Sequence, residues 1–188
     1  TLAERLRAAS RVTLLTGAGV SAASGVPTFR GPDGLWKRHR PESLATPEAF
    51  ANDPKLVWEW YLWRRRRIAD CRPNPAHEVI AAWNRRYPAF TLLTQNVDGL
   101  HELAGTAGVL RMHGSLWEVS CCNRCAGSPT RWEDRRTEFD ELPPRCPHCR
   151  GLIRPGVVWF GESLDPEVLR RCDAALDCDI FMTIGTSS

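Results

Sequence analysis

Three short apolar runs rich in β-branched residues divide the chain, and each leads into a polar or glycine-containing turn. They cover residues 12–16, 90–94 and 179–184, and they have the lengths of buried β-strands. Patterns typical of helices cover residues 55–71 and 74–87. Buried strands that alternate with helices predict a parallel sheet in an α/β fold, which binds ligands at the carboxyl ends of its strands.

The turn after the first run has the spacing of a nucleotide-binding loop. Gly17, Gly19 and Ala22 satisfy the pattern G-x-G-x-x-G/A at the start of a helix made of small residues. Glycines let a backbone approach a pyrophosphate, and the N-terminus of a helix turns free N–H groups toward its charge. A plain strand–turn–helix would place glycines in the same way, so the motif alone leaves both interpretations open.

A change of composition between residues 120 and 154, to Cys, Pro, Arg and Gly, predicts a smaller module inserted into the α/β domain. Cys122 and Cys125 form one C-x2-C pair in this module, and Cys146 and Cys149 form another. Four thiolates at this spacing can complete a tetrahedral shell around one zinc ion. Such a shell has no open position, which predicts a structural metal.

Other uses of these cysteines remain open. Cys121 could replace Cys122 at a C-x3-C spacing, and His148 is a rival ligand in the second pair. Disulfide bonds are a further alternative, but the length of the chain and the paired spacing favour a metal site in a reducing, intracellular compartment.

Composition narrows the class of protein only slightly. The chain has 188 residues, of which 43% are hydrophobic and 25% charged, and these values suit one globular domain with a satellite. Its net charge of +3 gives no reason to expect nucleic acid or a membrane as a partner. No apolar run approaches the roughly eighteen residues of a membrane helix, and no signal peptide opens the sequence, so a cytoplasmic location is expected.

Several stretches, in this order, resemble the sirtuin family. They read GAGVSAASGVPTFRG, TQNVDGLHELAG, MHGSLWEVSC, the two cysteine pairs, RPGVVWFGE and GTSS, and they span nearly the whole chain. The resemblance implies an NAD-dependent protein-lysine deacylase. Such an enzyme cleaves the bond between nicotinamide and ribose, moves the acyl group to the ribose, and releases nicotinamide, O-acyl-ADP-ribose and free lysine.

The resemblance also implies an organisation of the chain. Sirtuins continue past GTSS through further strands and helices, so the C-terminal part of the family fold is expected to be absent here. The expected protein is a monomer whose substrates are acyl-lysine proteins or peptides bound as an extended strand. The expected parts are a Rossmann-like NAD-binding domain (1–30, 77–114 and 155–188), a loop and helical module (31–76) and a zinc-binding module (115–154).

Single residues take their roles from the same resemblance. His113 matches the catalytic base, which accepts a proton relayed from the ribose hydroxyls, a task that histidine can perform near neutral pH. A satisfied core histidine is the alternative, and it is favoured for His39, His77 and His101. The residues that match NAD contacts are Gly17, Ala18, Gly19, Ser21, Phe29, Arg30, Gln95, Asn96, Asp98, Gly185, Thr186 and Ser187.

Two pairs among these NAD contacts have distinct tasks. Asn96 and Asp98 match the polar pair of the nicotinamide pocket, although NVDG without its context is simply a turn. Phe29 and Arg30 match the loop that covers the cleavage site and keeps water from the reactive sugar.

The helix expected at residues 55–71 carries four consecutive arginines, 64–67. Arg64 falls on an apolar stripe of this helix, unlike Arg65 and Arg66. An arginine on such a stripe is suited to a buried anion, because its planar fork can hold a carboxylate through two hydrogen bonds. A solvated run of arginines is the alternative.

The resemblance favours the first interpretation of Arg64. Tyr61 and Arg64 match the Tyr-x-x-Arg motif of the class III subgroup, which removes succinyl, malonyl and glutaryl groups, and Ala45 matches its small pocket residue. An acidic-acyl preference, with acetyl also removed, is therefore expected, with Tyr61 and Arg64 gripping the distal carboxylate. Val158, Phe160 and Gly161 match the segment that pairs with the substrate backbone, and a core strand is the alternative or additional role.

Two other functions compete with deacylation. An NAD-dependent mono-ADP-ribosyltransferase would share the NAD motifs, whereas a zinc ribbon without catalysis would bind nucleic acid through the cysteine module. The second leaves GAGVS and MHGS unexplained.

Overall fold

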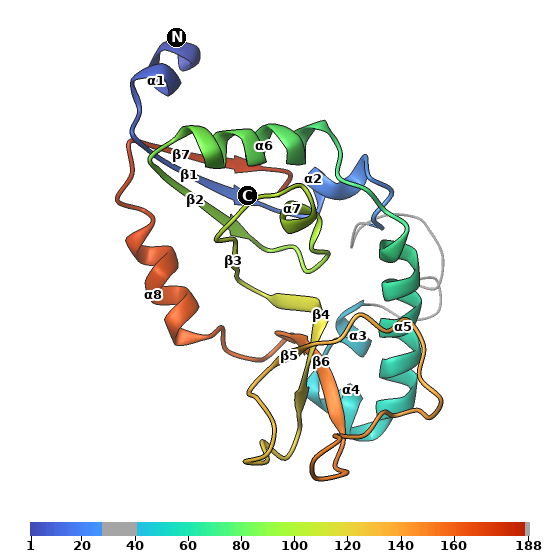
Figure 1. Cartoon of the computed structure of the whole chain (residues 1–188). Helices are drawn as coiled ribbons and strands as arrows, with labels where there is room; N and C mark the ends of the chain where they lie inside the picture. Colours follow the sequence, from blue (N-terminus) through green and yellow to red (C-terminus); the bar gives the residue numbers. More distant parts are fainter. Residues whose placement is uncertain (28–40, 187–188) are drawn as a thin grey trace. The chain divides into compact units, whose positions relative to one another are not determined.

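The computed structural model describes residues 1–27 and 41–186 of the chain. It divides into two compact units, each assembled from segments far apart in the sequence (Figure 1). Unit 1 comprises residues 1–28, 71–113 and 164–188, and unit 2 comprises 29–70 and 114–163. The helical segment and the cysteine module therefore belong to the same unit. Within the described ranges, no helix is long and apolar enough to cross a membrane.

Unit 1 contains a four-stranded parallel sheet with the strand order β3-β2-β1-β7, which confirms the predicted α/β class. Thr16, the last residue of the central strand, pairs with Thr94 on one side and Ile184 on the other, so three strands end level. The strands are β1 (Arg11–Thr16), β2 (Ala89–Thr94), β3 (Leu110–Arg111) and β7 (Ile180–Ile184).

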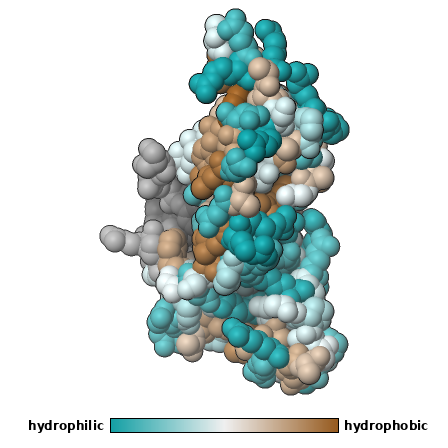
Figure 2. Space-filling view, turned by 90° about the vertical axis from the view of Figure 1, so that its left-hand side faces the viewer, coloured by the Kyte–Doolittle hydropathy of each residue, from teal (hydrophilic) through white to brown (hydrophobic). Residues whose placement is uncertain are grey.

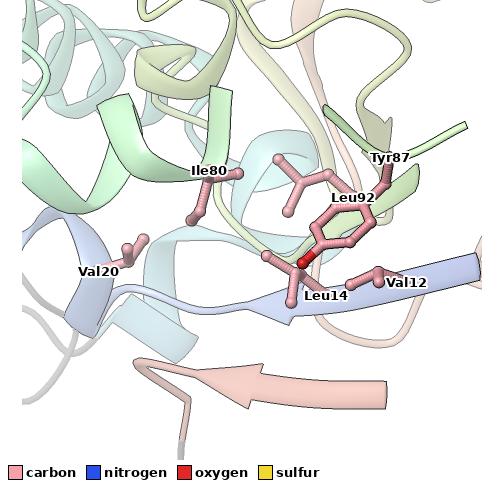
Figure 3. Close-up of a cluster of buried hydrophobic side chains, with 6 residues drawn as sticks. All are labelled: Val12, Leu14, Val20, Ile80, Tyr87 and Leu92. Carbon is pink, nitrogen blue, oxygen red and sulfur yellow. The ribbon is translucent and has the colours of Figure 1, made fainter. Parts of the chain in front are cut away.

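One face of this sheet packs against helix α6 (Pro75–Arg86). Figure 3 shows Val12 and Leu14 of β1 and Leu92 of β2 pointing toward Ile80 and Tyr87 at this face. Alternate residues of a strand point to opposite faces, so the spacing of Val12 and Leu14 places both in the same layer. Two short helices follow the first two strands in sequence, α2 (Gly19–Ala22) after β1 and α7 (Leu100–Leu103) after β2. Helix α1 (Leu2–Ala8) precedes β1.

Helix α8 (Pro166–Ala174) covers the opposite face, which makes the sheet doubly wound (Figure 1). Its Cys172 packs with Leu93 and Leu110 of the strands. The sequence does not predict this helix, although Asp165 caps its N-terminus by accepting a hydrogen bond from the Glu167 N–H at 2.8 Å. Hydrophilic residues cover much of the face drawn in Figure 2, with hydrophobic surface between them.

In its described residues, unit 2 combines a three-stranded antiparallel sheet, in the order β5-β4-β6, with three helices. Thr46 caps helix α4 and Asp53 caps helix α5, and each of these helices has a proline at its first position. The strands are β4 (Gly114–Cys121), β5 (Trp132–Glu133) and β6 (Ile153–Val157). The helices are α3 (Pro41–Leu44), α4 (Pro47–Asn52) and α5 (Pro54–Ala69).

The sequence places Arg64, rather than Arg65, on the apolar stripe of α5, and the structure corrects this expectation. Arg65 is the arginine of the run that is fully buried, at 0% exposure. Its Nε donates to the Leu116 carbonyl at 2.9 Å, and its Nη1 donates to the Arg136 carbonyl at 2.8 Å and contacts Asp134 at 3.4 Å. Burial lowers the pKa of Arg65 to about 10, against the opposing effect of Asp134. The side chain thus ties α5 to β4 and to the segment after β5, and Arg64 is only half-buried.

We predict that Arg65→Met destabilises the protein by about 3 kcal/mol, because a buried carboxylate and two carbonyls lose their donor while the apolar stem is largely kept. Chemical denaturation measures this loss. The matched control is Arg66→Met on the same helix, which removes an exposed side chain and should change the free energy of unfolding by no more than about 0.5 kcal/mol. Equal stability of the two variants would contradict the structural role of Arg65.

Candidate active site and metal centre

The level carboxyl ends of the strands gather the residues expected to contact NAD. Gln95 follows β2 and donates its N–H to the Thr16 carbonyl at 2.9 Å. Thr186 follows β7, and its hydroxyl donates to Gln95 Oε1 at 3.0 Å. Three turns from distant parts of the sequence therefore meet at one edge of the sheet, where an open parallel sheet binds its ligands.

Two of these turns touch backbone to backbone, which explains the glycines of the motif. The Gly19 N–H donates to the Gly185 carbonyl at 2.8 Å. A Cβ on Gly17 would lie 2.6 Å from the Cβ of Thr186, and one on Gly19 would lie 2.9 Å from the Cα of Gly185, so neither position has room for a side chain. The Ala18 N–H has no hydrogen-bond acceptor among the described residues, and this leaves one backbone donor of the turn available to a phosphate.

Ser21 connects the glycine turn after β1 to the residues expected for the nicotinamide pocket. Its buried hydroxyl donates to Asp98 Oδ2 at 2.8 Å and accepts from Asn96 Nδ2 at 3.3 Å. His77 Nε2 lies 3.3 Å from the same oxygen. Because His77 Nδ1 accepts the N–H of Asn74, the neutral ring carries its proton on Nε2 and donates to Ser21. Burial lowers the pKa of His77, despite the nearby Asp98, which favours this neutral form.

A second buried chain of hydrogen bonds supports Asn96 from below. The hydroxyl of Thr16 donates to that of Thr94 at 2.9 Å, and the Thr94 hydroxyl accepts from the backbone N–H of Asn96 at 3.1 Å. His101 Nε2 lies 2.9 Å from the Thr16 hydroxyl, and its ring is 4.8 Å from that of His77. Burial, reinforced by His77, lowers the pKa of His101 to about 4.

The sequence alone assigns no function to the residues that support Asn96 and Ser21. His77 fits the expectation of a satisfied core histidine, because both of its ring nitrogens have partners. His101 fits it only in part, because its buried Nδ1 has no hydrogen-bond partner among the described residues. Thr16 and Thr94 are the last residues of two apolar strands, and these matching positions are the signal in the sequence that could point to their contact. Since that match depends on strand register, a single sequence does not reveal the hydrogen bond between them.

His113 lies between β3 and β4 and is half-buried. Its Nδ1 is 3.0 Å from the Gln95 carbonyl oxygen. A carbonyl can only accept, so Nδ1 carries the proton and Nε2 presents its lone pair. The backbone of Gln95, an expected NAD contact, thus fixes the tautomer that acid–base chemistry at Nε2 requires.

The residues expected to hold the acyl-lysine lie in unit 2, and the structure brings several of them together. The Phe160 N–H donates to the Ala45 carbonyl at 2.9 Å. The intervening Trp159 donates its indole N–H to the Tyr61 hydroxyl at 2.9 Å. The guanidinium carbon of Arg64 lies 5.8 Å from the centre of the Tyr61 ring, so Tyr61 and Arg64 share one side of α5. Val158 and Gly161 belong to the same loop after β6.

The metal centre consists of four thiols, which fit one zinc ion. The sulfurs of Cys121, Cys125, Cys146 and Cys149 all lie within 4.8 Å of one another. Two of their separations are 3.5 Å and 3.8 Å, close to the edge of about 3.8 Å in a tetrahedron with Zn–S bonds of about 2.3 Å. With all four positions filled by sulfur, the ion has a structural role.

The expected ligand Cys122 is therefore wrong, and Cys121 takes its place. Cys121 is the last residue of β4 and is buried, on the same face of the strand as Val119, whereas Cys122 is exposed. The turn closes through a hydrogen bond from the Arg124 N–H to the Cys121 carbonyl, with Arg124 in the left-handed region at φ 46°. A shift of one residue along a strand moves a side chain to the other face, which decides between the two cysteines.

Four expected residues lie outside the described part of the chain, and the structure places none of them. They are Phe29, Arg30, His39 and Ser187.

We predict that Cys121→Ser loses zinc and lowers the thermal stability, because binding of the metal is part of the folding free energy. Cys122→Ser is the matched control and should retain one zinc per chain with a melting temperature near that of the wild type. Metal analysis by mass spectrometry together with thermal unfolding measures both. Retention of zinc by Cys121→Ser and its loss from Cys122→Ser would restore the C-x2-C assignment.

We predict a loss of stability in acid that depends on His101. Its pKa is about 4 in the folded protein and about 6.5 in an unfolded chain, so only the unfolded state binds the proton between these values. The free energy of unfolding should fall by about 3 kcal/mol as the pH decreases through this window. His101→Gln should remove this part of the slope in denaturation measured at several pH values, whereas zinc release affects both proteins alike. An unchanged slope would show that His101 is not buried as a neutral ring.

Known proteins share this fold. Residues 17–188 match the Sir2 family. An NAD-dependent protein deacylase of Aquifex aeolicus (strain VF5) is 50% identical over 177 residues, which cover 94% of this chain and 72% of that protein. A crystal structure of a Sir2 homologue in complex with NAD is 45% identical, with a TM-score of 0.90, and the match covers 99% of this chain and 72% of that one.

A structure of a Sir2 protein with a deacetylated p53 peptide and 3'-O-acetyl ADP ribose is also similar, with a TM-score of 0.82 and 27% identity. That match covers 98% of this chain and 75% of the other. The family match and the identity to the Aquifex protein agree with the resemblance seen in the sequence, and they show that this chain belongs to the Sir2 family.

Proposed function

We propose that the chain is an NAD-dependent protein-lysine deacylase that releases nicotinamide and O-acyl-ADP-ribose. One observation carries the proposal: His113, with Nδ1 held by the Gln95 carbonyl, stands at the same sheet edge as the glycine turn and the Asn96–Asp98 pair. Support also comes from the Aquifex relative, which is named an NAD-dependent protein deacylase. NAD is a consumed co-substrate in this reaction, and zinc stays structural.

Each group at this edge has a defined task in the proposed reaction. The turn at Gly17–Gly19 binds the phosphates, and Asn96 and Asp98 bind the nicotinamide amide. Cleavage of the nicotinamide–ribose bond lets the acyl oxygen attach to the ribose. His113 Nε2 then accepts the proton relayed from the ribose hydroxyls, because its other nitrogen already donates to the backbone.

A mono-ADP-ribosyltransferase is the runner-up, since it would use the same NAD contacts. The two functions differ in whether nicotinamide release requires an acyl-lysine peptide. We expect release to depend on the peptide and to yield O-acyl-ADP-ribose.

We predict that His113→Ala lowers kcat for deacylation at least about 100-fold while NAD binding stays within about threefold, because the base acts on the reacting sugar rather than on the bound phosphates. Product formation by mass spectrometry and NAD binding by calorimetry separate the two effects. Arg85→Ala, which changes an exposed residue of α6, is the control. Near-normal turnover of His113→Ala would refute the role.

We further propose that the enzyme prefers acidic acyl groups such as succinyl, malonyl and glutaryl, and also removes acetyl. The support is the placement of Tyr61 and Arg64 on one side of α5, near the loop that carries Phe160. A guanidinium and a phenol on one side can hold a carboxylate through charged hydrogen bonds. In this arrangement the loop after β6 pairs with the extended substrate backbone.

We predict that Arg64→Met lowers kcat/KM for a succinyl-lysine peptide about 30-fold or more, corresponding to about 2 kcal/mol for a lost contact to a charged group, and spares the acetyl-lysine peptide. Arg66→Met is the control, because Arg66 is exposed on the same helix. If the wild type prefers acetyl-lysine by kcat/KM, the proposed acyl preference is wrong, while deacylation itself would stand.

A further inference from the structure

Trp159 and Tyr61 share a buried hydrogen bond that has a fixed direction. Their side chains are 3% and 1% exposed, and Trp159 Nε1 lies 2.9 Å from the Tyr61 hydroxyl oxygen. An indole N–H can donate but cannot accept. The Tyr61 oxygen is therefore the acceptor, and its own O–H is directed elsewhere. Among residues 1–27 and 41–186 this proton has no hydrogen-bond acceptor, so within the described part of the chain Tyr61 is available as a donor to a ligand.

Trp159 is itself held from three sides. The carboxylate of Glu162 accepts the Trp159 backbone N–H at 2.8 Å. The guanidinium carbon of Arg154 lies 3.5 Å from the centre of the indole ring, and both of its terminal nitrogens bind Glu162, at 2.5 Å and 2.8 Å. Phe50 packs against the ring with 5.2 Å between centroids. A side chain fixed in this way can fix its hydrogen-bond partner in turn.

The Tyr61 hydroxyl is suited to donate a hydrogen bond to an anionic ligand. Burial raises the pKa of Tyr61 to about 12, against the opposing charge of Arg64, so the phenol keeps its proton at any physiological pH. A donated hydrogen bond from Trp159 also polarises the phenol and strengthens its O–H as a donor. A carboxylate accepts such a bond, whereas the methyl end of an acetyl group cannot.

We infer that Trp159 is a positioning residue for acyl selectivity: its indole N–H orients the Tyr61 hydroxyl as a donor to the distal carboxylate of an acidic acyl-lysine. This inference rests on the proposed acidic-acyl preference. It adds a residue whose indole acts on the substrate through Tyr61 rather than by direct contact. The loop that pairs with the substrate backbone thus also sets the chemistry of the acyl pocket.

The test compares succinyl-lysine and acetyl-lysine forms of one peptide on the whole zinc-loaded chain. Trp159→Phe removes the N–H and keeps an aromatic ring against Arg154 and Phe50. We expect kcat/KM for the succinyl peptide to fall about fivefold, mainly through KM, as for the loss of one hydrogen bond, and the value for the acetyl peptide to stay within about twofold. Tyr61→Phe should change the ratio of the two substrates in the same direction.

The matched control is Trp58→Phe on α5. It also removes a buried indole N–H, which donates to the Ile153 carbonyl at 2.9 Å, and thermal unfolding shows whether the two variants lose similar stability. A purely structural role predicts that both variants lower activity on both peptides equally, and that result would overturn the inference. A second result would overturn the inference about Trp159 but leave the acidic-acyl preference standing. In that result the wild type prefers succinyl-lysine, and Tyr61→Phe reduces this preference whereas Trp159→Phe does not. A wild type that prefers acetyl-lysine overturns both the inference and the proposed preference, and peptide-independent nicotinamide release would overturn deacylation itself.

Discussion

The buried hydroxyl of Ser21 is the point on which the NAD side of this protein depends. It donates to Asp98 and accepts from Asn96 and His77, so three polar side chains are satisfied by one oxygen at 0% exposure. Burying such groups is costly unless each finds a partner, and a partly satisfied network is worse than none. This requirement fixes the turn after β1, the turn after β2 and the start of α6 in one arrangement.

The level strand ends make that arrangement possible. Thr16 and Thr94 stand side by side in the register of β1 and β2, so their hydroxyls can bond to each other and to the backbone of Asn96. Gly17 and Gly19 then let the first turn touch the turn after β7 without a side chain between them. Rigid placement of this kind is what a site needs when its groups must meet a sugar and an amide in a defined geometry.

Unit 2 uses buried polar groups for a different purpose. Arg65 of α5 donates to a carbonyl of β4 and to a carbonyl of the segment after β5. It thereby joins the helix to the sheet whose strand β4 ends at the zinc ligand Cys121. Trp159 and Tyr61 form a smaller buried pair, in which the direction of the bond follows from the indole alone. Helix α5 therefore has two roles: Arg65 makes it a structural support, and Tyr61 makes it a wall of the proposed acyl pocket.

The sequence by itself determined the parallel α/β sheet, the use of paired cysteines for zinc and the family resemblance, because these depend on local apolar runs and on short fixed spacings. Only the tertiary structure decided which of two adjacent cysteines, Cys121 or Cys122, faces the other thiols, since one step along a strand reverses the side chain. The same holds for Arg65, which is buried because carbonyls and a carboxylate more than fifty residues away satisfy its charge. The support of Asn96 by Thr16, Thr94 and His101 likewise depends on strand register, a long-range property that no window of sequence contains.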